Sequence, residues 1–166
     1  MFSTANLKTQ PGRYALIAES ILPVIFILIV GSFLRPTNAA GENVVGRPPG
    51  IVFGIVWFIL VCMWTLALVV TAMDERSLLI VILIGCFSLI SLMACLFWLV
   101  SYKQNKKDFS AMSLIVATAM MIGCVISSMN GLAPQASKTI SSLFYSFIAT
   151  WLSAATLFNY IEINKQ

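Results

Sequence analysis

Few side chains in this sequence are of the types that carry out chemistry. The chain of 166 residues has no histidine, and histidine is the commonest general base and metal ligand. There is no Ser/Lys or Cys/His constellation for nucleophilic catalysis, no pair of carboxylates within one apolar segment and no GxxxxGK[ST] motif. Asp74, Glu75 and Asp108 lie between the apolar segments, where we expect loops. We therefore expect no enzyme, no metal and no cofactor.

Four cysteines and one glutamate do fall inside apolar segments. The cysteines form no CxxC pair, which is typical of small packing residues rather than of disulfides or metal ligands. They are Cys62, Cys86, Cys95 and Cys124. A charge at the centre of a membrane helix costs about 2.5–3.5 kcal/mol on insertion scales. Glu19 is therefore expected either to reach the membrane interface or to act as a polar group in a cavity.

The elements that position these side chains are long and apolar. Hydrophobic residues make up 60% of the chain, charged residues 10%, and the mean hydropathy is +0.96, whereas about a quarter of a soluble domain is charged. Segments of about 18–24 residues can cross roughly 30 Å of hydrocarbon as helices. The sequence predicts an all-α protein, a single domain over 1–166 and an integral membrane bundle of five helices. These lie at about 14–34, 51–72, 78–100, 111–128 and 140–161.

The first segment resembles a signal peptide, because Lys8 and Arg13 precede it, but it is longer than the apolar region of such peptides. We therefore expect a membrane helix there, with a kink at Pro23.

The basic residues indicate orientation rather than nucleic-acid binding. With a net charge of +4, six Lys and Arg residues fall on one side of the predicted bundle and four on the other, which favours a cytosolic C-terminus. The larger group is Arg35, Arg47, Lys103, Lys106, Lys107 and Lys165, and the smaller is Lys8, Arg13, Arg76 and Lys138. The three lysines at 103–107 are expected to contact anionic lipid headgroups.

Two helices carry aromatic residues on defined faces. In the second, helical geometry places Phe53, Trp57, Leu60 and Trp64 on one stripe, which fits either packing or lipid contact, or the wall of a ligand site. In the fifth, Trp151, Ala155 and Asn159 lie on one line and could wall a cavity or pack between helices. Trp98 and Tyr102, at the end of the third segment, are expected to be interfacial anchors.

Two stretches resemble the TspO/MBR family, which includes the translocator protein (peripheral benzodiazepine receptor) and the tryptophan-rich sensory proteins. They are "PPGIVFGIVW", with Pro48, Pro49 and Trp57, and "WLSAATLFNY", with Trp151 and Ala155. The resemblance implies five helices, a ligand pocket within the bundle, a lid formed by the loop between the first two helices and a possible homodimer. In a eukaryote it implies the mitochondrial outer membrane. The ligand-binding residues expected from it are Phe53, Trp57, Trp151, Ala155, Phe158 and Asn159.

The chain departs from the family pattern mainly at polar and aromatic positions. The family's usual Trp, Pro and Tyr in the second helix are replaced by Ile51, Ile55 and Val61, and its Pro-Tyr in the fifth by Phe147 and Ile148. The positions of the family's helix 3 Gln, Asn and Trp correspond to Cys86, Ile90, Ser91 and Met93. These losses predict weaker binding of porphyrins and benzodiazepine-type drugs than in typical members.

A possible sterol contact is formed by Leu157, Tyr160 and Lys165, which satisfy the pattern L-x(1–5)-Y-x(1–5)-K, common by chance. The function expected from the resemblance is binding of a flat apolar ligand, such as a sterol, tetrapyrrole or lipid, for transport or sensing. The alternative is a structural or interaction scaffold in the membrane without a small-molecule ligand. An enzyme is suggested only by the porphyrin breakdown known in the family.

Overall fold

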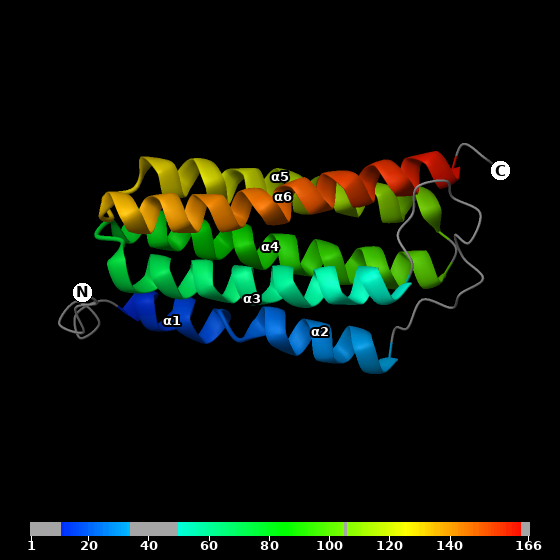
Figure 1. The fold of residues 1–166 in the computed structure, drawn as a ribbon, viewed down its shortest axis with the longest axis horizontal. Coiled ribbons are helices and arrows are strands. Elements are labelled where there is room, and N and C mark those ends of the chain that lie inside the picture. The colour runs from blue at the N-terminus through cyan, green and yellow to red at the C-terminus, as the bar shows by residue number, and fades with distance from the viewer. Residues whose placement is uncertain (1–10, 34–49, 105, 164–166) are drawn as a thin grey trace.

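The computed structural model describes residues 11–33, 50–104 and 106–163, and within them all regular structure is helical (Figure 1). The helices are α1 (Pro11–Glu19), α2 (Leu22–Phe33), α3 (Gly50–Asp74), α4 (Leu78–Lys103), α5 (Lys107–Asn130) and α6 (Gln135–Ile163). Asp74 is thus the last residue of α3 and Asp108 lies in the first turn of α5, so the prediction of loops at these two positions is wrong. Glu75 does lie between two helices.

Five helical stretches are long and apolar enough to cross a membrane, as the sequence predicts. They are Gly12–Ile29, Gly54–Asp74, Leu78–Lys103, Lys107–Asn130 and Gln135–Ile161. Their cores match the predicted segments, and their ends extend into polar sequence, because polar residues continue each helix beyond its apolar centre.

The first stretch is interrupted between α1 and α2, at Ser20 and Ile21. Pro23 has no N–H to donate to the Glu19 carbonyl, and the Val24 N–H donates to the Ile21 carbonyl at 3.1 Å instead of to Ser20. The helix is therefore interrupted just before Pro23, where the sequence predicts a kink within a single helix. The first span therefore consists of two short helices. Between them, some main-chain groups make no helical hydrogen bond.

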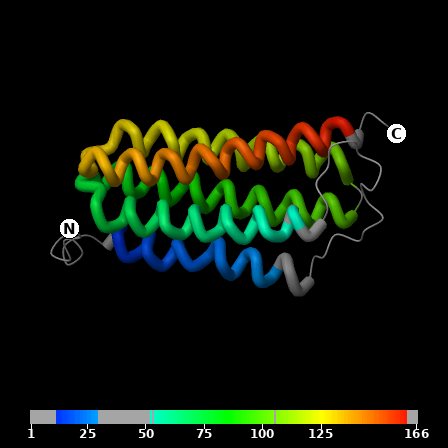
Figure 2. Tube along the Cα trace, in the orientation of Figure 1, coloured from blue at the N-terminus to red at the C-terminus, as the bar shows by residue number. Residues whose placement is uncertain are grey.

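The helices run alternately up and down the long axis of the molecule. The α1–α2 pair packs against α3 and α4, and α4, α5 and α6 form the most extensive interfaces (Figure 2). At one end of the bundle lie the starts of α3 and α5 and the ends of α2, α4 and α6 (Figure 1). This end carries the predicted ligand-binding residues Trp57 and Asn159.

The centre of the bundle is filled by large side chains with paired polar groups among them. Trp64 is 1% exposed and its indole N–H donates to the Ser88 hydroxyl at 2.8 Å. Ser91 donates to the Ala117 carbonyl at 3.0 Å and joins α4 to α5. A methyl group on Gly123 would lie 2.9 Å from the Phe87 ring, so the glycine allows α5 to approach α4. The core therefore specifies how the helices pack.

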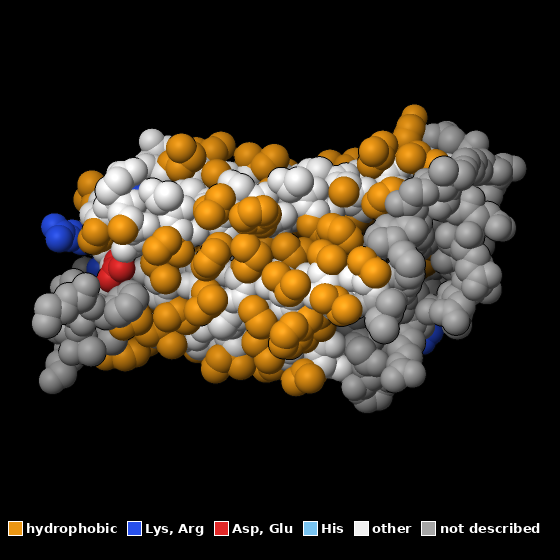
Figure 3. Space-filling model, viewed as in Figure 1, with side chains coloured by type: hydrophobic (Ala, Val, Ile, Leu, Met, Phe, Trp, Pro, Cys, Tyr) orange, Lys and Arg blue, Asp and Glu red, His pale blue; other side chains and the backbone are white. Residues whose placement is uncertain are grey.

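The outer surface is apolar along the helices and charged near the ends. Large aliphatic and aromatic side chains face outward, among them Leu28, Phe58 and Met112, each at least 60% exposed. In the face seen in Figure 3 they cover the middle of the molecule, and the visible Lys, Arg, Asp and Glu atoms lie toward its ends. This distribution suits a bundle surrounded by hydrocarbon with its ends in water.

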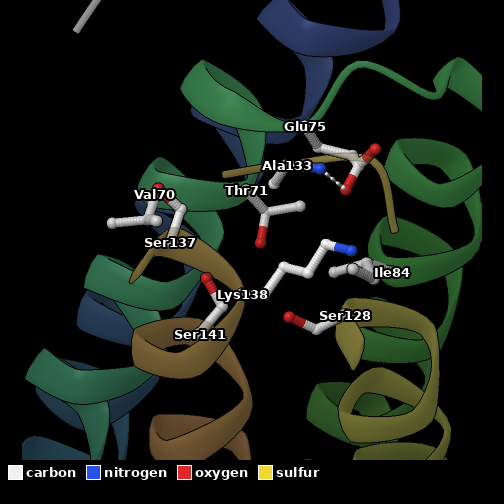
Figure 4. A pocket seen from close by; sticks show the side chains of 9 residues that line it. All are labelled: Val70, Thr71, Glu75, Ile84, Ser128, Ala133, Ser137, Lys138 and Ser141. Carbon is white, nitrogen blue, oxygen red and sulfur yellow. Dashed lines mark hydrogen bonds between the residues drawn. The ribbon is translucent and has the colours of Figure 1, made fainter. Parts of the chain in front are cut away.

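The end opposite Trp57 is closed by a buried carboxylate. Glu75 is 2% exposed and accepts the N–H groups of Ser77 (2.8 Å), Leu132 (2.8 Å) and Ala133 (3.2 Å). It thus joins the α3–α4 turn to the α5–α6 turn. Beside it lies a cavity of about 10 Å³, large enough for one water molecule, and the Lys138 ammonium group points into it (Figure 4).

Candidate ligand-binding site

An aromatic cluster is centred on Trp57 near the start of α3. Trp57 is 6% exposed; its ring stacks on that of Trp98 from α4, with ring centres 6.2 Å apart and planes at 16°. The Phe26 ring of α2 packs on it at 5.8 Å and a tilt of 47°. The predicted stripe on α3 does face inward at Trp57, Leu60 and Trp64, whereas the Phe53 side chain lies outside the described residues.

An amide from α6 borders this cluster. The Asn159 Oδ1 accepts the Trp98 indole N–H at 3.4 Å and the Ser110 hydroxyl at 3.2 Å. Its Nδ2 donates to the Ala155 carbonyl at 2.8 Å, which fixes the orientation of the amide. Three helices, α4, α5 and α6, therefore meet through one side chain. Asn159 thus makes contacts between helices, one of the two roles that the line Trp151–Ala155–Asn159 allows.

Trp98 is a functional candidate that the sequence interpretation missed. It is 4% exposed and lies between Trp57 and Asn159, so the prediction of an interfacial anchor is wrong. Its ring also contacts the half-buried Tyr102 at 6.3 Å. The sequence does contain a pattern that indicates its burial, because small residues precede it on one helical face at intervals of three and four. These residues, all buried in α4, are Ser88, Ser91 and Cys95.

The remaining predicted pocket residues lie on the inner or flanking face of α6. Ala155 is 4% exposed and belongs to the hydrophobic core, and Trp151 is half-buried and packs against that core. Phe158 is also half-buried. The described contacts link Ala155 to Trp57 through Asn159 and Trp98.

The sterol-contact residues occupy a different face. Leu157 and Tyr160 are 57% and 60% exposed on the outside of α6, and Lys165 lies outside the described residues. A sterol held by this pattern would therefore lie on the outer surface of the bundle and not in the aromatic cluster.

The α4 positions that the resemblance aligns with the polar residues of the TspO/MBR family lie mainly on the outer face of the helix. Cys86, Ile90 and Met93 are exposed on the outer face of α4. Ser91 is fully buried, and its hydroxyl is engaged with the Ala117 carbonyl. The hydrogen-bonding capacity beside Trp57 therefore comes from Asn159 and Ser110 instead.

Among the described residues, no group of three or more His, Cys, Asp or Glu side chains could hold a metal ion. Cys95 and Cys124 are buried, whereas Cys62 and Cys86 face outward, so the packing role predicted for all four applies to the first two. The candidate site is thus a set of packed flat rings with one amide and one hydroxyl at its edge.

Comparison of the chain with models of protein families, with curated proteins and with solved structures found no match.

Proposed function

We propose that the protein is a multi-pass membrane protein of the TspO type that binds a flat apolar ligand, such as a sterol or tetrapyrrole, for transport or sensing. The observation that supports this most directly is the buried stack of Trp57 on Trp98, with the Asn159 amide at its edge. Aromatic pairs contribute about 0.5–1.5 kcal/mol beyond their buried area, and a flat ligand can make the same contacts.

A ligand would reach the rings by displacing α2. This helix packs on α3 and α4 at the edge of the bundle, and Phe26 is its contribution to the cluster. Moving Phe26 away uncovers one face of Trp57 without breaking a described hydrogen bond of Asn159. The ligand then takes the place of the Phe26 ring, so binding restores the apolar packing on Trp57 that opening removes.

The test is a binding titration of the reconstituted protein with protoporphyrin IX and with a fluorescent sterol. Trp57→Ala should weaken binding by about tenfold, which corresponds to about 1.4 kcal/mol. Phe58→Ala is the matched control, because Phe58 is the next residue of α3 and is 60% exposed on the outer face. Equal effects of the two substitutions would contradict the proposal.

The second candidate is a membrane scaffold without a small ligand. It is favoured by the burial of Trp57 and Ala155, whose neighbours are protein side chains. Ala155→Leu separates the two functions when stability and binding are measured on one preparation. In the scaffold the larger side chain overpacks the core and costs about 1–3 kcal/mol of stability. Loss of binding by a variant that stays folded would instead support the ligand-binding protein.

The location follows from the same proposal. Five apolar spans fit a multi-pass membrane protein, and in a eukaryotic cell the TspO resemblance points to the mitochondrial outer membrane. It also points to a homodimer, for which crosslinking in native membranes is the direct measurement: a crosslinked species of twice the monomer mass is expected.

A further inference from the structure

The break between α1 and α2 places a carboxyl group next to irregular backbone inside the first span. Glu19 is the last residue of α1, and Pro23 removes the donor that its carbonyl would have in a continuous helix. The Ser20 carbonyl accepts the Thr65 hydroxyl of α3 at 3.0 Å. Irregular backbone within membrane spans occurs where it is buried in protein or lines a polar cavity, and not where it faces lipid.

The Glu19 side chain lies between α1 and α4. A methyl group on Gly85 would lie 3.1 Å from its Oε2, so the glycine makes room for the carboxyl group. Its Oε1 is buried and has no hydrogen-bond partner among the described residues. The Ser88 hydroxyl, which accepts the Trp64 N–H at 2.8 Å, is a neutral polar group near the carboxyl.

No described cation neutralises Glu19. Arg13 on the same helix donates to the Ala72 carbonyl at 3.0 Å, and no described Lys or Arg is among the groups that influence the Glu19 carboxyl. The titratable groups within electrostatic range are the Cys124 thiol of α5 and the Tyr145 hydroxyl of α6, neither of which carries positive charge. The charged residues of α3 and α4 are Asp74 and Lys103, each the last residue of its helix.

An ionised carboxylate can accept about four hydrogen bonds, and one with a buried oxygen lacking a partner is poorly stabilised. Adding a proton removes the charge. We propose that Glu19 is a proton-binding site at the break in the first span, which holds a proton in the resting protein and exchanges it there. This proposal does not depend on the ligand site at Trp57.

A hydrophobic carbodiimide tests the proposal, because it partitions into bilayers and reacts with protonated carboxyl groups. The acid proton moves to a carbodiimide nitrogen while the carboxyl oxygen bonds to the central carbon, and the adduct rearranges to a stable N-acylurea. Peptide mass spectrometry of the protein in liposomes should find about tenfold more adduct on Glu19 than on Glu75, and less adduct as the pH is raised. Glu75 is the internal control, because three backbone N–H groups stabilise its carboxylate.

Two variants make the outcome decisive. Glu19→Gln keeps the size of the side chain and should abolish the adduct. Leu89→Glu in that background places a carboxyl on the exposed face of α4, where the reagent in the bilayer can reach it. Adduct at position 89 with none at Glu19 of the unmodified protein would overturn the proposal. Suppression of the Glu19 adduct by Na⁺ at constant pH would overturn it too, since the site would then hold a metal cation.

Infrared spectroscopy provides a readout that is independent of reagent access. The carbonyl stretch of a protonated carboxylic acid should be present in the reconstituted protein at neutral pH and lost in Glu19→Gln. If the two proteins have the same spectrum in this region, Glu19 is ionised and the proposal is wrong.

Discussion

Glu75 offers the sharpest test of how the bundle is held together. Its Oε1 accepts two backbone N–H groups, one from Ser77 and one from Leu132, and its Oε2 accepts the N–H of Ala133 (Figure 4). Hydrogen bonds to a charged group contribute about 1.5–3 kcal/mol each, and water at the end of the bundle replaces part of this stabilisation when the carboxylate is removed. We therefore expect Glu75→Ala to lower the free energy of unfolding by about 3–5 kcal/mol.

Glu75→Gln should have a smaller effect. The amide oxygen can keep the two bonds made by Oε1, but the amide NH₂ then meets the Ala133 N–H, donor against donor. The expected loss is about 1–2 kcal/mol, or a fall of about 2–8 °C in Tm for a chain of this size. Arg76→Gln is the matched control, because Arg76 is the next residue and is exposed. Its effect should stay within about 0.5 kcal/mol.

Gly131 provides an independent check of the same contact. Its φ of −68° is open to any residue, but a methyl group at this position would overlap the Glu75 Oε2. Gly131→Ala should therefore destabilise the protein when Glu75 is present and cost little when Glu75 is already alanine. Thermal unfolding in one detergent would measure all these variants. Additive effects of the two substitutions, or Glu75 variants as stable as Arg76→Gln, would refute the reasoning.

Three further predictions concern other parts of the bundle. Ser88→Ala leaves the buried Trp64 N–H without its acceptor and should cost about 1–3 kcal/mol of stability by thermal unfolding, whereas Ser88→Thr should retain most of it. Gly123→Leu should cost about 1–3 kcal/mol by overpacking against Phe87; an unchanged Tm would show that α5 does not approach α4 there. A cysteine introduced at Lys165 should react with a membrane-impermeant reagent from the cytosolic side; reaction only after permeabilisation would reverse the predicted orientation.

The positions of the helices could be predicted because hydrocarbon thickness sets a minimum length for an apolar segment. Their ends could not. The predicted last helix begins at 140, whereas α6 begins at Gln135, because the polar turn before the apolar run is helical too. Hydropathy locates the part of a helix that lies in lipid, and the rest of the helix is set by hydrogen bonds such as that of Ser137 with Asp74 at 2.6 Å.

The candidate site was predictable in part for a similar reason. The helical face of α3 fixes that Trp57 and Trp64 point the same way, and both are buried. Which side chains these two rings contact depends on the helix that packs against α3. The spacing of apolar residues within α3 does not identify that helix. Trp98 lies near the end of its apolar segment, where tryptophan is common at membrane interfaces, and its contact with Asn159 could not be predicted from the spacing of buried residues on α4.

The two ends of the bundle are closed by different forces, and this bears on where a ligand could enter. At the Glu75 end, opening would break hydrogen bonds to a carboxylate, which an apolar ligand cannot replace. At the Trp57 end, opening separates the Phe26 and Trp57 rings, whose apolar packing a flat ligand restores. Binding of an apolar ligand can therefore offset the free energy of opening at the Trp57 end, but not at the Glu75 end. For the proposed ligand-binding function we therefore expect access beside α2, the helix that carries Phe26.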